Sequence, residues 1–198
     1  MALIALEQLG YHYEDPYNPV FSDLNLGIDT AWKTGMVGRN GRGKTTLLNL
    51  LRGRLEPTVG CLSMPVAAAY FPYEPPVEGL SVARVIKASV APFEQWEERM
   101  QRLLEKGDEP SIEAYGELAS RFERLGGYQI DDIVAREAAL LGLGQEALVR
   151  PFATLSGGER TRALIIALFL RRDRFPLIDE PTNHLDMDGR QSLGRYLA

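Results

Sequence analysis

The sequence predicts an α/β fold with a core sheet, an antiparallel β part near the amino terminus and an inserted block of helices. A glycine-rich loop lies at residues 38–45, between a short apolar stretch and a helical pattern. The apolar period changes from two to three or four at about Ser81 and stays helical to about Leu141. A later apolar stretch ends in two acidic residues, Asp179 and Glu180. Strand and helix periods that alternate in this way favour a sheet covered by helices.

Composition limits the classes of protein that this chain can represent. It has 198 residues, 45% hydrophobic and 25% charged, which suits one globular domain with an insertion. The longest apolar run, 163–170, is shorter than the roughly 20 residues that cross a bilayer. The net charge of −5 argues against strong nucleic-acid binding by this chain alone. Any nucleic-acid partner would therefore be bound mainly by something other than these residues. The single cysteine, Cys61, excludes an internal disulfide and favours a cytoplasmic location.

Signals for short strands dominate the amino-terminal part. Residues 2–9 alternate loosely, a turn-rich segment follows, and residues 21–28 read as a second strand, which predicts an antiparallel pair. A short apolar strand is expected at 34–37, directly before the glycine loop. Two more strands fit residues 60–64 and 67–71, and a proline-rich loop follows them.

The middle of the chain has a helical pattern. Apolar residues spaced three or four apart define two helix faces, with a break at 106–111 between them. A third helix is expected at 132–141, with an Asp at its start and glycines past its end. Acidic and basic residues interleave on these helices, which favours a solvated surface over a recognition surface. The two apolar faces are Phe93, Trp96, Met100 and Leu103, and Tyr115, Leu118, Phe122 and Leu125.

Residues 155–160 read Leu-Ser-Gly-Gly-Glu-Arg and begin a long apolar helix. Ser156, followed three positions later by Glu159, is a capping box that predicts a well-formed helix start. Gly157 and Gly158 are unexpected in that first turn, because Gly weakens a helix interior by about 0.5–1 kcal/mol relative to Ala. They indicate that another group approaches the backbone closely; a structural cap with flexible glycines is the alternative.

The loop at 38–45 satisfies G-x-x-x-x-G-K-[ST], the pattern of a phosphate-binding loop. Its glycines let consecutive backbone N–H groups surround a β-phosphate, and the dipole of the following helix adds to the attraction. Lys44 would bridge the β- and γ-phosphates, and the Thr45 hydroxyl would ligate Mg²⁺. A glycine turn that matches by coincidence is the alternative. The other loop residues expected at the nucleotide are Gly38, Asn40, Gly41, Arg42, Gly43 and Thr46.

A second half of the site is expected where the apolar residues 175–178 form a buried strand. The carboxylate of Asp179 would emerge at the carboxyl end of a parallel sheet, next to the phosphate loop, and hold a Mg²⁺-bound water. Glu180 would then act as the general base that polarises the attacking water. Two solvated acids that end a strand are the alternative.

Together, residues 38–46, 155–160 and 179–186 resemble the motifs of the ATP-binding-cassette (ABC) ATPases, in the family's order and spacing. The resemblance covers the whole chain. Asp-Glu-Pro-Thr-Asn-His-Leu-Asp at 179–186 looks most like the ABC-F branch, soluble proteins with two cassettes that act on ribosomes. Within that branch the sequence resembles the antibiotic-resistance, ribosome-protection members.

The resemblance implies a P-loop NTPase (RecA-like) core sheet, with ATP and Mg²⁺ as ligands. Residues 1–78 would form the antiparallel β and P-loop part, 79–150 the helical subdomain, and 151–198 the signature helix, the Walker B strand and the D-loop. The family continues with further strands, a connector and a second cassette. We therefore expect these residues to be a fragment that binds Mg-ATP but hydrolyses it slowly or not at all.

In this family two cassettes pack head to tail, with ATP held between the P-loop of one and the signature helix of the other. The resemblance implies that Ser156, Gly157, Gly158 and Glu159 complete the site of a partner cassette, in the same full-length chain or a dimer mate. Side chains at the two glycines would block that approach. Asp186 would be the main contact of the segment that links the two sites.

An aromatic residue that stacks on adenine is also expected from the resemblance. Tyr13 lies at about the family's distance upstream of the P-loop, and a flat apolar base suits a tyrosine ring. Tyr11 and Tyr17 compete for this role, and a core or surface tyrosine is the alternative.

Two departures from the family pattern weaken the catalytic expectation. Tyr73 stands where the family has a glutamine that senses Mg²⁺ and water, and a phenol lacks the amide carbonyl; whether it or Glu74 substitutes stays open. The family's switch histidine is missing, since His12 and His184 are the two histidines and His184 belongs to the linking segment.

The sequence therefore predicts ATP binding and Mg²⁺-dependent hydrolysis in a two-cassette sandwich, with ribosome engagement through regions outside these residues. An ATPase subunit that works with transmembrane transporter subunits is the first alternative. A regulatory ATP-binding module without useful turnover is the second. Preference between ATP and GTP stays open.

Overall fold

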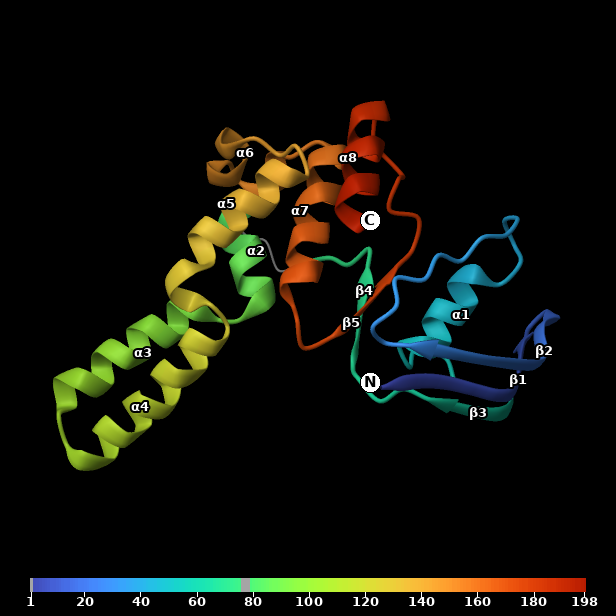
Figure 1. The fold of residues 1–198 in the computed structure, drawn as a ribbon, viewed down its shortest axis with the longest axis horizontal. Coiled ribbons are helices and arrows are strands. Elements are labelled where there is room, and N and C mark those ends of the chain that lie inside the picture. The colour runs from blue at the N-terminus through green and yellow to red at the C-terminus, as the bar shows by residue number, and fades with distance from the viewer. Residues whose placement is uncertain (1, 76–78) are drawn as a thin grey trace. The chain divides into compact units, whose positions relative to one another are not determined.

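A computed structural model describes residues 2–75 and 79–198, and Figure 1 shows the order of their helices and strands. The chain divides into two compact units, Met1–Phe71 with Arg172–Glu180, and Pro72–Arg171 with Pro181–Ala198. Pro76, the end of the predicted proline-rich loop, and the predicted boundary at residue 78 lie outside the described residues.

The first unit contains a three-stranded antiparallel sheet. Strand β1 (Leu3–Glu14) pairs with β2 (Tyr17–Asp29) on one edge and with β3 (Val59–Ser63) on the other. The antiparallel pair and the third strand are confirmed, and both hairpin strands extend further toward their turn than the sequence predicts.

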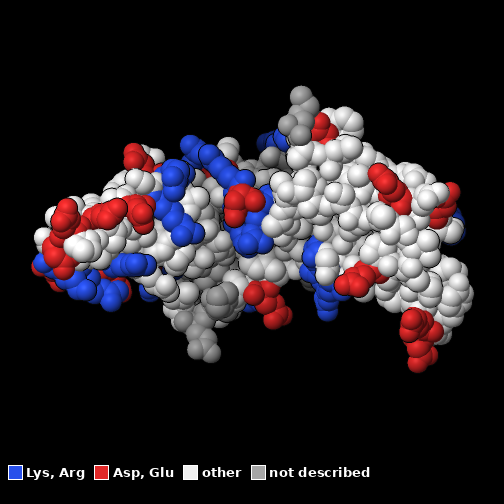
Figure 2. Space-filling view, turned by 90° about the horizontal axis from the view of Figure 1, so that it is seen from below, with Lys and Arg blue, Asp and Glu red and all other residues white. Residues whose placement is uncertain are grey.

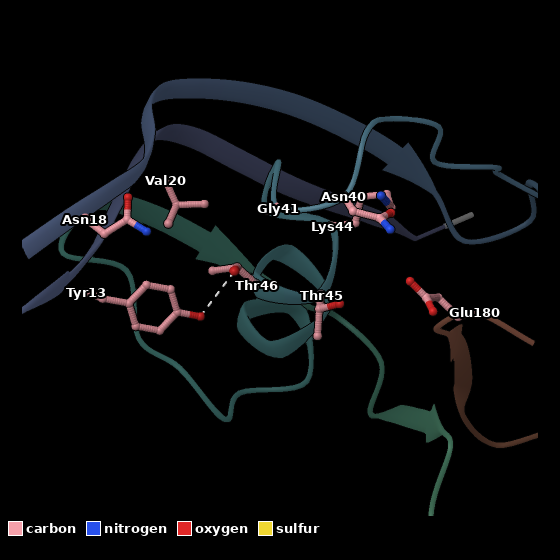
Figure 3. A pocket seen from close by; sticks show the side chains of 10 residues that line it. Tyr13, Asn18, Val20, Asn40, Gly41, Lys44, Thr45, Thr46 and Glu180 are labelled. Atoms are coloured by element: carbon pink, nitrogen blue, oxygen red, sulfur yellow. Dashed lines mark hydrogen bonds between the residues drawn. The ribbon is translucent and has the colours of Figure 1, made fainter. Parts of the chain in front are cut away.

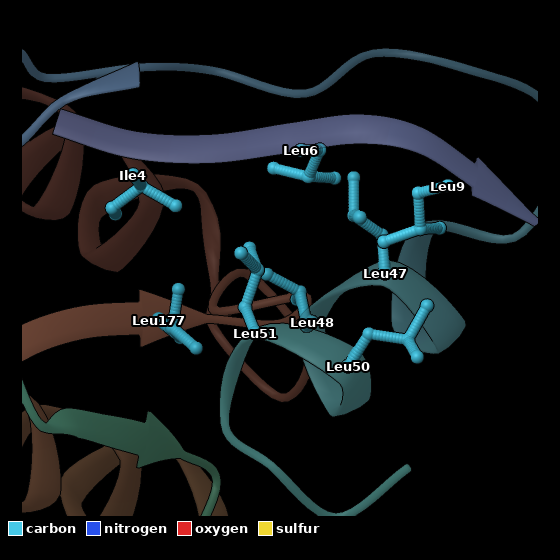
Figure 4. Close-up of a cluster of buried hydrophobic side chains, with 8 residues drawn as sticks. All are labelled: Ile4, Leu6, Leu9, Leu47, Leu48, Leu50, Leu51 and Leu177. Carbon is cyan, nitrogen blue, oxygen red and sulfur yellow. The ribbon is translucent and has the colours of Figure 1, made fainter. Parts of the chain in front are cut away.

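Helix α1 (Lys44–Leu51) packs its leucines against β1, as Figure 4 shows. Successive side chains of a strand point to opposite faces, so Ile4 and Leu6 share a face and Leu9 would face away. An irregularity in the pairing between Leu6 and Leu9 shifts this alternation by one residue and returns Leu9 to the core. Each buried Leu or Ile contributes about 1.5–3 kcal/mol relative to an exposed position. The cluster comprises Ile4, Leu6, Leu9, Leu47, Leu48, Leu50, Leu51 and Leu177.

A two-stranded parallel sheet completes the first unit. Strand β4 (Ala68–Phe71) pairs with β5 (Phe175–Ile178), so that Tyr70 lies opposite Leu177. The Asp179 N–H continues the pairing by donating to the Phe71 carbonyl at 3.0 Å. Asp179 therefore leaves the sheet at its carboxyl end, where the P-loop lies within hydrogen-bonding reach.

The strand predicted at 34–37 is wrong, because these residues form no strand. Val37 is 99% exposed and Met36 43% exposed. An extended segment becomes a strand when its backbone pairs with a neighbour, and the parallel sheet of the described residues consists of β4 and β5. Two apolar residues between Gly35 and Gly38 bury too little surface to fix the segment by themselves.

The second unit is helical, and it contains the helices predicted between residues 81 and 141. The first turn of α4 begins after Gly107, which has a left-handed φ of 64°, and Asp108, whose side chain accepts the Ser111 N–H at 2.8 Å. These two residues form the predicted break between the helical faces, and α3 and α4 run side by side as a hairpin in Figure 1. Its helices are α2 (Val82–Val90), α3 (Phe93–Lys106), α4 (Glu109–Arg124), α5 (Ile130–Leu140), α6 (Gln145–Val149), α7 (Gly157–Leu170) and α8 (Met187–Leu197), with short 3-10 turns at Gly127–Gln129 and Phe152–Thr154.

Charges on the α3–α4 hairpin are mixed. Figure 2 shows basic and acidic side chains interspersed at this end of the unit, without one large patch of either sign. Phe93, Met100 and Phe122 of the two predicted apolar faces are buried, and the rings of Phe93 and Phe122 meet edge to face at 5.4 Å. Leu125, at the end of the second face, is instead exposed. Throughout the described residues, no helix is long and apolar enough to cross a membrane.

Candidate nucleotide-binding site

A cavity of about 290 Å³ lies in the first unit, along the loop that precedes α1. Figure 3 shows it extending from Tyr13 at one side to Glu180 at the other. Of the predicted loop residues, Gly38 and Arg42 do not line it. Its walls are formed by Tyr13, Asn18, Val20, Asn40, Gly41, Gly43, Lys44, Thr45, Thr46 and Glu180.

Two loop glycines have conformations that other residues rarely adopt. Gly41 and Gly43 have φ angles of 77° and 87°. A Cβ atom on Gly43 would lie 2.6 Å from Val20 Cγ1 and 2.8 Å from the Phe21 ring, so a side chain is excluded sterically as well. The left-handed turn at Gly43 directly precedes α1, and no side chain caps this helix. The first-turn N–H groups of α1 therefore have no side-chain acceptor, which suits an anion.

Lys44 is held across the loop by two carbonyl groups. Its Nζ donates to Gly38 at 2.7 Å and to Arg39 at 3.1 Å. A lysine ammonium has three donors, so one N–H is left for a phosphate oxygen. Gly38 thus takes part in the site by fixing Lys44.

The Thr45 hydroxyl and the Asp179 carboxylate lie together below the loop. Thr45 donates to Asp179 Oδ2 at 2.7 Å, although 134 positions separate the two residues in the sequence. Both groups are hard oxygen donors of the kind that Mg²⁺ prefers. No cluster of three or more His, Cys, Asp or Glu side chains that could hold a metal occurs in the described parts of the chain. The pair fits Mg²⁺ bound in its usual way, through few protein ligands with phosphate and water completing the shell.

Glu180 lies at the end of the cavity opposite Tyr13, with its side chain directed into the space beside Lys44 and Thr45 (Figure 3). Its φ angle is 46°, a left-handed value that is uncommon for a residue with a side chain. Such conformations cost about 1–3 kcal/mol and concentrate at functional sites. The strained backbone directs a carboxylate into the cavity.

Tyr13 is the tyrosine that lines this cavity. Its hydroxyl lies 3.2 Å from the Thr46 hydroxyl, and the Tyr11 ring meets its ring edge to face at 5.1 Å. Tyr11 and Tyr17 instead line a separate hollow on the antiparallel sheet. Of the three tyrosines that the sequence left open, Tyr13 therefore lines the cavity beside the P-loop, and Tyr11 and Tyr17 do not.

Asn18 and Val20 also line the cavity, and sequence reasoning missed both. Asn18 lies directly opposite Tyr13 in the β1–β2 pairing. The hairpin register would have revealed Asn18 as a neighbour of Tyr13, but the first strand predicted from the sequence ends at residue 9 and the second begins at residue 21, so neither residue was placed in a strand.

The four predicted residues at the start of α7 lie in the second unit. Ser156 Oγ accepts the Glu159 N–H at 3.3 Å, and Glu159 Oε2 accepts the Ser156 N–H at 2.8 Å, so the predicted capping box is present. Arg150 donates to the other Glu159 oxygen at 3.0 Å. The hydrogen bonds from Ser156, followed by Arg150, lower the pKa of Glu159. The first turn of α7 therefore already satisfies two of its own N–H groups.

Gly157 and Gly158 lie against the segment that precedes α8. A Cβ atom on Gly157 would lie 3.2 Å from His184 Cβ, and one on Gly158 would lie 3.0 Å from the His184 carbonyl oxygen. His184 itself has a left-handed φ of 67°. One group that approaches these glycines is therefore the protein's own chain, which the sequence did not reveal.

Asp186 and Tyr73 have partners within the second unit. Asp186 caps α8 by accepting the Gly189 N–H at 2.9 Å, and it pairs with Arg162 at 3.2 Å. The Tyr73 hydroxyl donates to Ser89 on α2 at 3.2 Å. Burial raises the pKa of Tyr73, which keeps it a neutral donor. Tyr73, the residue expected in place of the family's glutamine, is thus hydrogen-bonded to helix α2.

Comparison with known proteins identifies the chain. The sequence model of the ABC transporter family matches residues 21–183, which include the P-loop, the start of α7 and Asp179. The chain belongs to the ABC transporter family. The match, together with the likeness to a solved cassette given below, confirms the predicted α/β P-loop fold class.

The curated relatives of this chain include ABC-F proteins. The chain is 34% identical to the tylosin resistance ATP-binding protein TlrC of Streptomyces fradiae, over 92% of this chain and 35% of that protein. It is 29% identical to ATP-binding cassette sub-family F member 3 of Mus musculus, over 98% of this chain and 23% of that protein. The cassette thus spans well under half the length of these relatives.

A solved structure supports the fold. The dimeric structure of MJ0796, a bacterial ABC transporter cassette, superposes with a TM-score of 0.65 at 17% identity. The match covers 98% of this chain and 81% of that one. At this identity the likeness concerns the fold.

Proposed function

We propose that this cassette binds Mg-ATP in the cavity beside α1 and hydrolyses it when paired with a second cassette, as part of an ABC-F protein that acts on the ribosome. The observation that carries the proposal is the 2.7 Å hydrogen bond between Thr45 and Asp179, which joins the P-loop to the strand that ends in two acids. Two unrelated turns would have no reason to place these groups together beside one cavity.

Each lining residue has a role that follows from its chemistry. The open turn at Gly41 and Gly43 would offer backbone N–H groups to the β-phosphate, and the remaining Lys44 donor would contact the γ-phosphate. Mg²⁺, when bound by Thr45 and through Asp179, would neutralise charge on the β- and γ-phosphates. Tyr13 would stack on the base at the other end of the cavity.

Glu180 would act as the general base. Its carboxylate would accept a proton from a water molecule while the water oxygen forms a bond to the γ-phosphorus. The bond from the γ-phosphorus to the β–γ bridging oxygen would break, and ADP and phosphate would leave. The inward direction of the Glu180 side chain supports this role.

The pairing partner would be a second cassette, whose P-loop nucleotide would meet Ser156, Gly157 and Gly158. Support comes from the dimeric cassette among the structural neighbours. Action on the ribosome is supported by the similarity to a sub-family F member and to a tylosin resistance protein. The sequence resemblance of residues 179–186 to the ABC-F branch points the same way.

A transporter subunit is the second candidate function. It is favoured by the likeness to solved transporter cassettes, among them a putative metal-chelate type ABC transporter with a TM-score of 0.64. In that role the helical unit would contact transmembrane subunits, and the ATP chemistry would be unchanged.

Replacing Glu180, the proposed general base, tests both the proposed hydrolysis and the proposed action on the ribosome. In the full-length protein, Glu180→Gln should lower ATP turnover by about 100-fold or more while ATP affinity stays within about twofold, because a glutamine cannot accept the proton. Glu7→Gln, which alters an exposed carboxyl on β1, is the matched control and should leave turnover unchanged. Unchanged turnover in Glu180→Gln would show that Glu180 is not the base.

The same variant tests the ribosome proposal. With turnover blocked and ATP present, the protein should co-sediment with ribosomes, and it should remain in the supernatant when ATP is omitted. A protein that binds ATP but stays in the supernatant under both conditions would favour the transporter function.

A further inference from the structure

Asp179 accepts a second hydrogen bond, from a residue that no motif includes. The hydroxyl of Tyr70, on β4, donates to Asp179 Oδ2 at 3.0 Å. Thr45 donates to the same oxygen at 2.7 Å. Within the described residues no hydrogen bond is directed at Oδ1. One oxygen of this carboxylate is thus held by two hydroxyl groups, and the other is left for an outside ligand.

The sheet places Tyr70 where it can make this bond. Tyr70 lies opposite Leu177 in the parallel pairing, and Asp179 follows two residues later, on the same face as Leu177. The tyrosine side chain is long enough for its hydroxyl to reach from the Tyr70–Leu177 pair to Asp179 on that face. Burial and the bond to Asp179 raise the pKa of Tyr70, so its hydroxyl keeps the proton that it donates.

Arg52 holds the Tyr70 ring from the other side. Its guanidinium carbon lies 3.9 Å from the centre of the ring, a cation–π contact. Arg52 is the C-cap residue of α1, whose first turn carries Thr45. Within the described residues the buried Arg52 Nε has no hydrogen-bond partner, so no hydrogen bond at this nitrogen draws the guanidinium away from the ring. Both ends of α1 therefore act on Asp179, through Thr45 directly and through Arg52 by way of Tyr70.

We propose that Tyr70, supported by Arg52, is a positioning residue that fixes the Asp179 carboxylate and thereby sets the Mg²⁺-dependent part of nucleotide binding. This inference rests on the proposed function of the cavity. With Oδ2 held by Tyr70 and Thr45, the carboxylate cannot rotate about its bond to Cβ, and Oδ1 keeps one direction. A tyrosine that merely filled the core would need its ring but not its hydroxyl.

Tyr70→Phe separates the two roles, because it keeps the ring and removes the hydroxyl. The quantity to measure is the ratio of the Kd for ATP in EDTA to the Kd for ATP in excess Mg²⁺, by titration calorimetry. We expect this ratio to fall by about 10-fold, the typical effect of losing a hydrogen bond to a charged group. The Kd in EDTA should stay within about twofold. Tyr17→Phe, at an exposed tyrosine of the same unit, is the matched control and should keep the wild-type ratio.

A double-mutant cycle with Arg52→Met tests the supporting contact. Arg52→Met alone should lower the ratio by about twofold to fivefold, and it should have no further effect in the Tyr70→Phe background. Independent effects of the two changes would overturn the role of Arg52. Thermal unfolding of each variant confirms that it is folded. The cycle requires both single variants, and Tyr70→Phe alone still tests the positioning role if Arg52→Met is too unstable.

The outcomes distinguish failure of the inference from failure of the proposed function. A wild-type protein whose ATP affinity does not depend on Mg²⁺ would overturn both. A wild-type protein with Mg²⁺-dependent affinity and a Tyr70→Phe variant with the same ratio would overturn the inference alone. Equal weakening of binding in EDTA and in Mg²⁺ would also overturn it, since that result indicates a packing role.

Discussion

Two helix starts in this protein carry glycines, and their local structures are opposite. At α1 the glycines are left-handed, no side chain caps the helix, and the first turn has no acidic residue. At α7 the glycines have ordinary φ angles, Ser156 and Glu159 cap the helix, and residue 184 packs against the glycine backbone. One start leaves its N–H donors to a cavity, whereas the other satisfies donors with its own side chains.

The difference teaches that glycine at a helix start does not by itself identify an anion site. What matters is how many N–H donors remain without an acceptor. At α7 an incoming phosphate would also meet the Glu159 carboxylate, whose charge Arg150 offsets at 3.0 Å. We therefore expect the P-loop to bind nucleotide by itself, and the α7 start to add only to a nucleotide that another P-loop already holds.

The largest expected effect is on ATP affinity and comes from removing Lys44 of the P-loop. Lys44→Ala should weaken ATP binding by about 100-fold, because it removes the charge-assisted contact to the phosphates. Ser156→Ala should leave the affinity of the dilute, unpaired chain within about twofold. Lys106→Ala, at the exposed end of α3, controls for loss of a lysine. Fluorescence titration with an ATP analogue measures all three, and equal weakening by Lys44→Ala and Ser156→Ala would refute the division of labour.

A smaller effect is expected on the free energy of unfolding, where alanine substitutions of Gly43 and Gly157 should differ. Gly43→Ala should lower the free energy of unfolding by about 1–3 kcal/mol, because φ is left-handed there and the new Cβ would contact Val20 and Phe21. Gly157→Ala should change it by less than about 1 kcal/mol, since better helix propensity offsets a 3.2 Å contact with His184. Urea unfolding curves provide both values, and a larger loss at Gly157 would reverse the comparison.

The smallest expected effect concerns the charge of Glu159 at the start of α7. The folded-state pKa of Glu159 is lowered, so its stabilisation is present at neutral pH and is lost as the pH falls through that pKa, below the usual value of about 4.3. Glu159→Gln should therefore destabilise the protein at pH 7, by about 0.3–1 kcal/mol, and the difference from wild type should shrink in more acidic solution. Unfolding by urea at a series of pH values measures it. A difference that does not change with pH would show that the charge of Glu159 is unimportant.

Much of the fold could be predicted because its signals are local. The helical period, the capping box at Ser156 and the break at Gly107 and Asp108 each depend on residues within one or two turns. The strand at 34–37 could not be judged in this way, because a strand depends on a pairing partner elsewhere in the chain. Leu9 illustrates the same limit, since its burial requires a pairing irregularity that alternation alone does not indicate.

The candidate site divides along the same line. Lys44, Thr45 and Asp179 were predictable because motif spacing alone identifies them. Asn18 and Tyr70 were missed because each reaches the site through strand register, opposite Tyr13 in one sheet and opposite Leu177 in the other. Residues that a sheet brings to a site carry no mark in the local sequence.

The most direct test of the account is to ask which chain's nucleotide meets the start of α7. The exposed Cys61 is first replaced by Ser in all chains, and Ser156→Cys supplies a target for an ATP derivative with a thiol-reactive group on its γ-phosphate. A chain that carries both Lys44→Ala and Ser156→Cys should be labelled at position 156 only when a second chain with an intact P-loop is added. Labelling at position 156 in a dilute, unpaired chain with its own Lys44 intact would contradict the account.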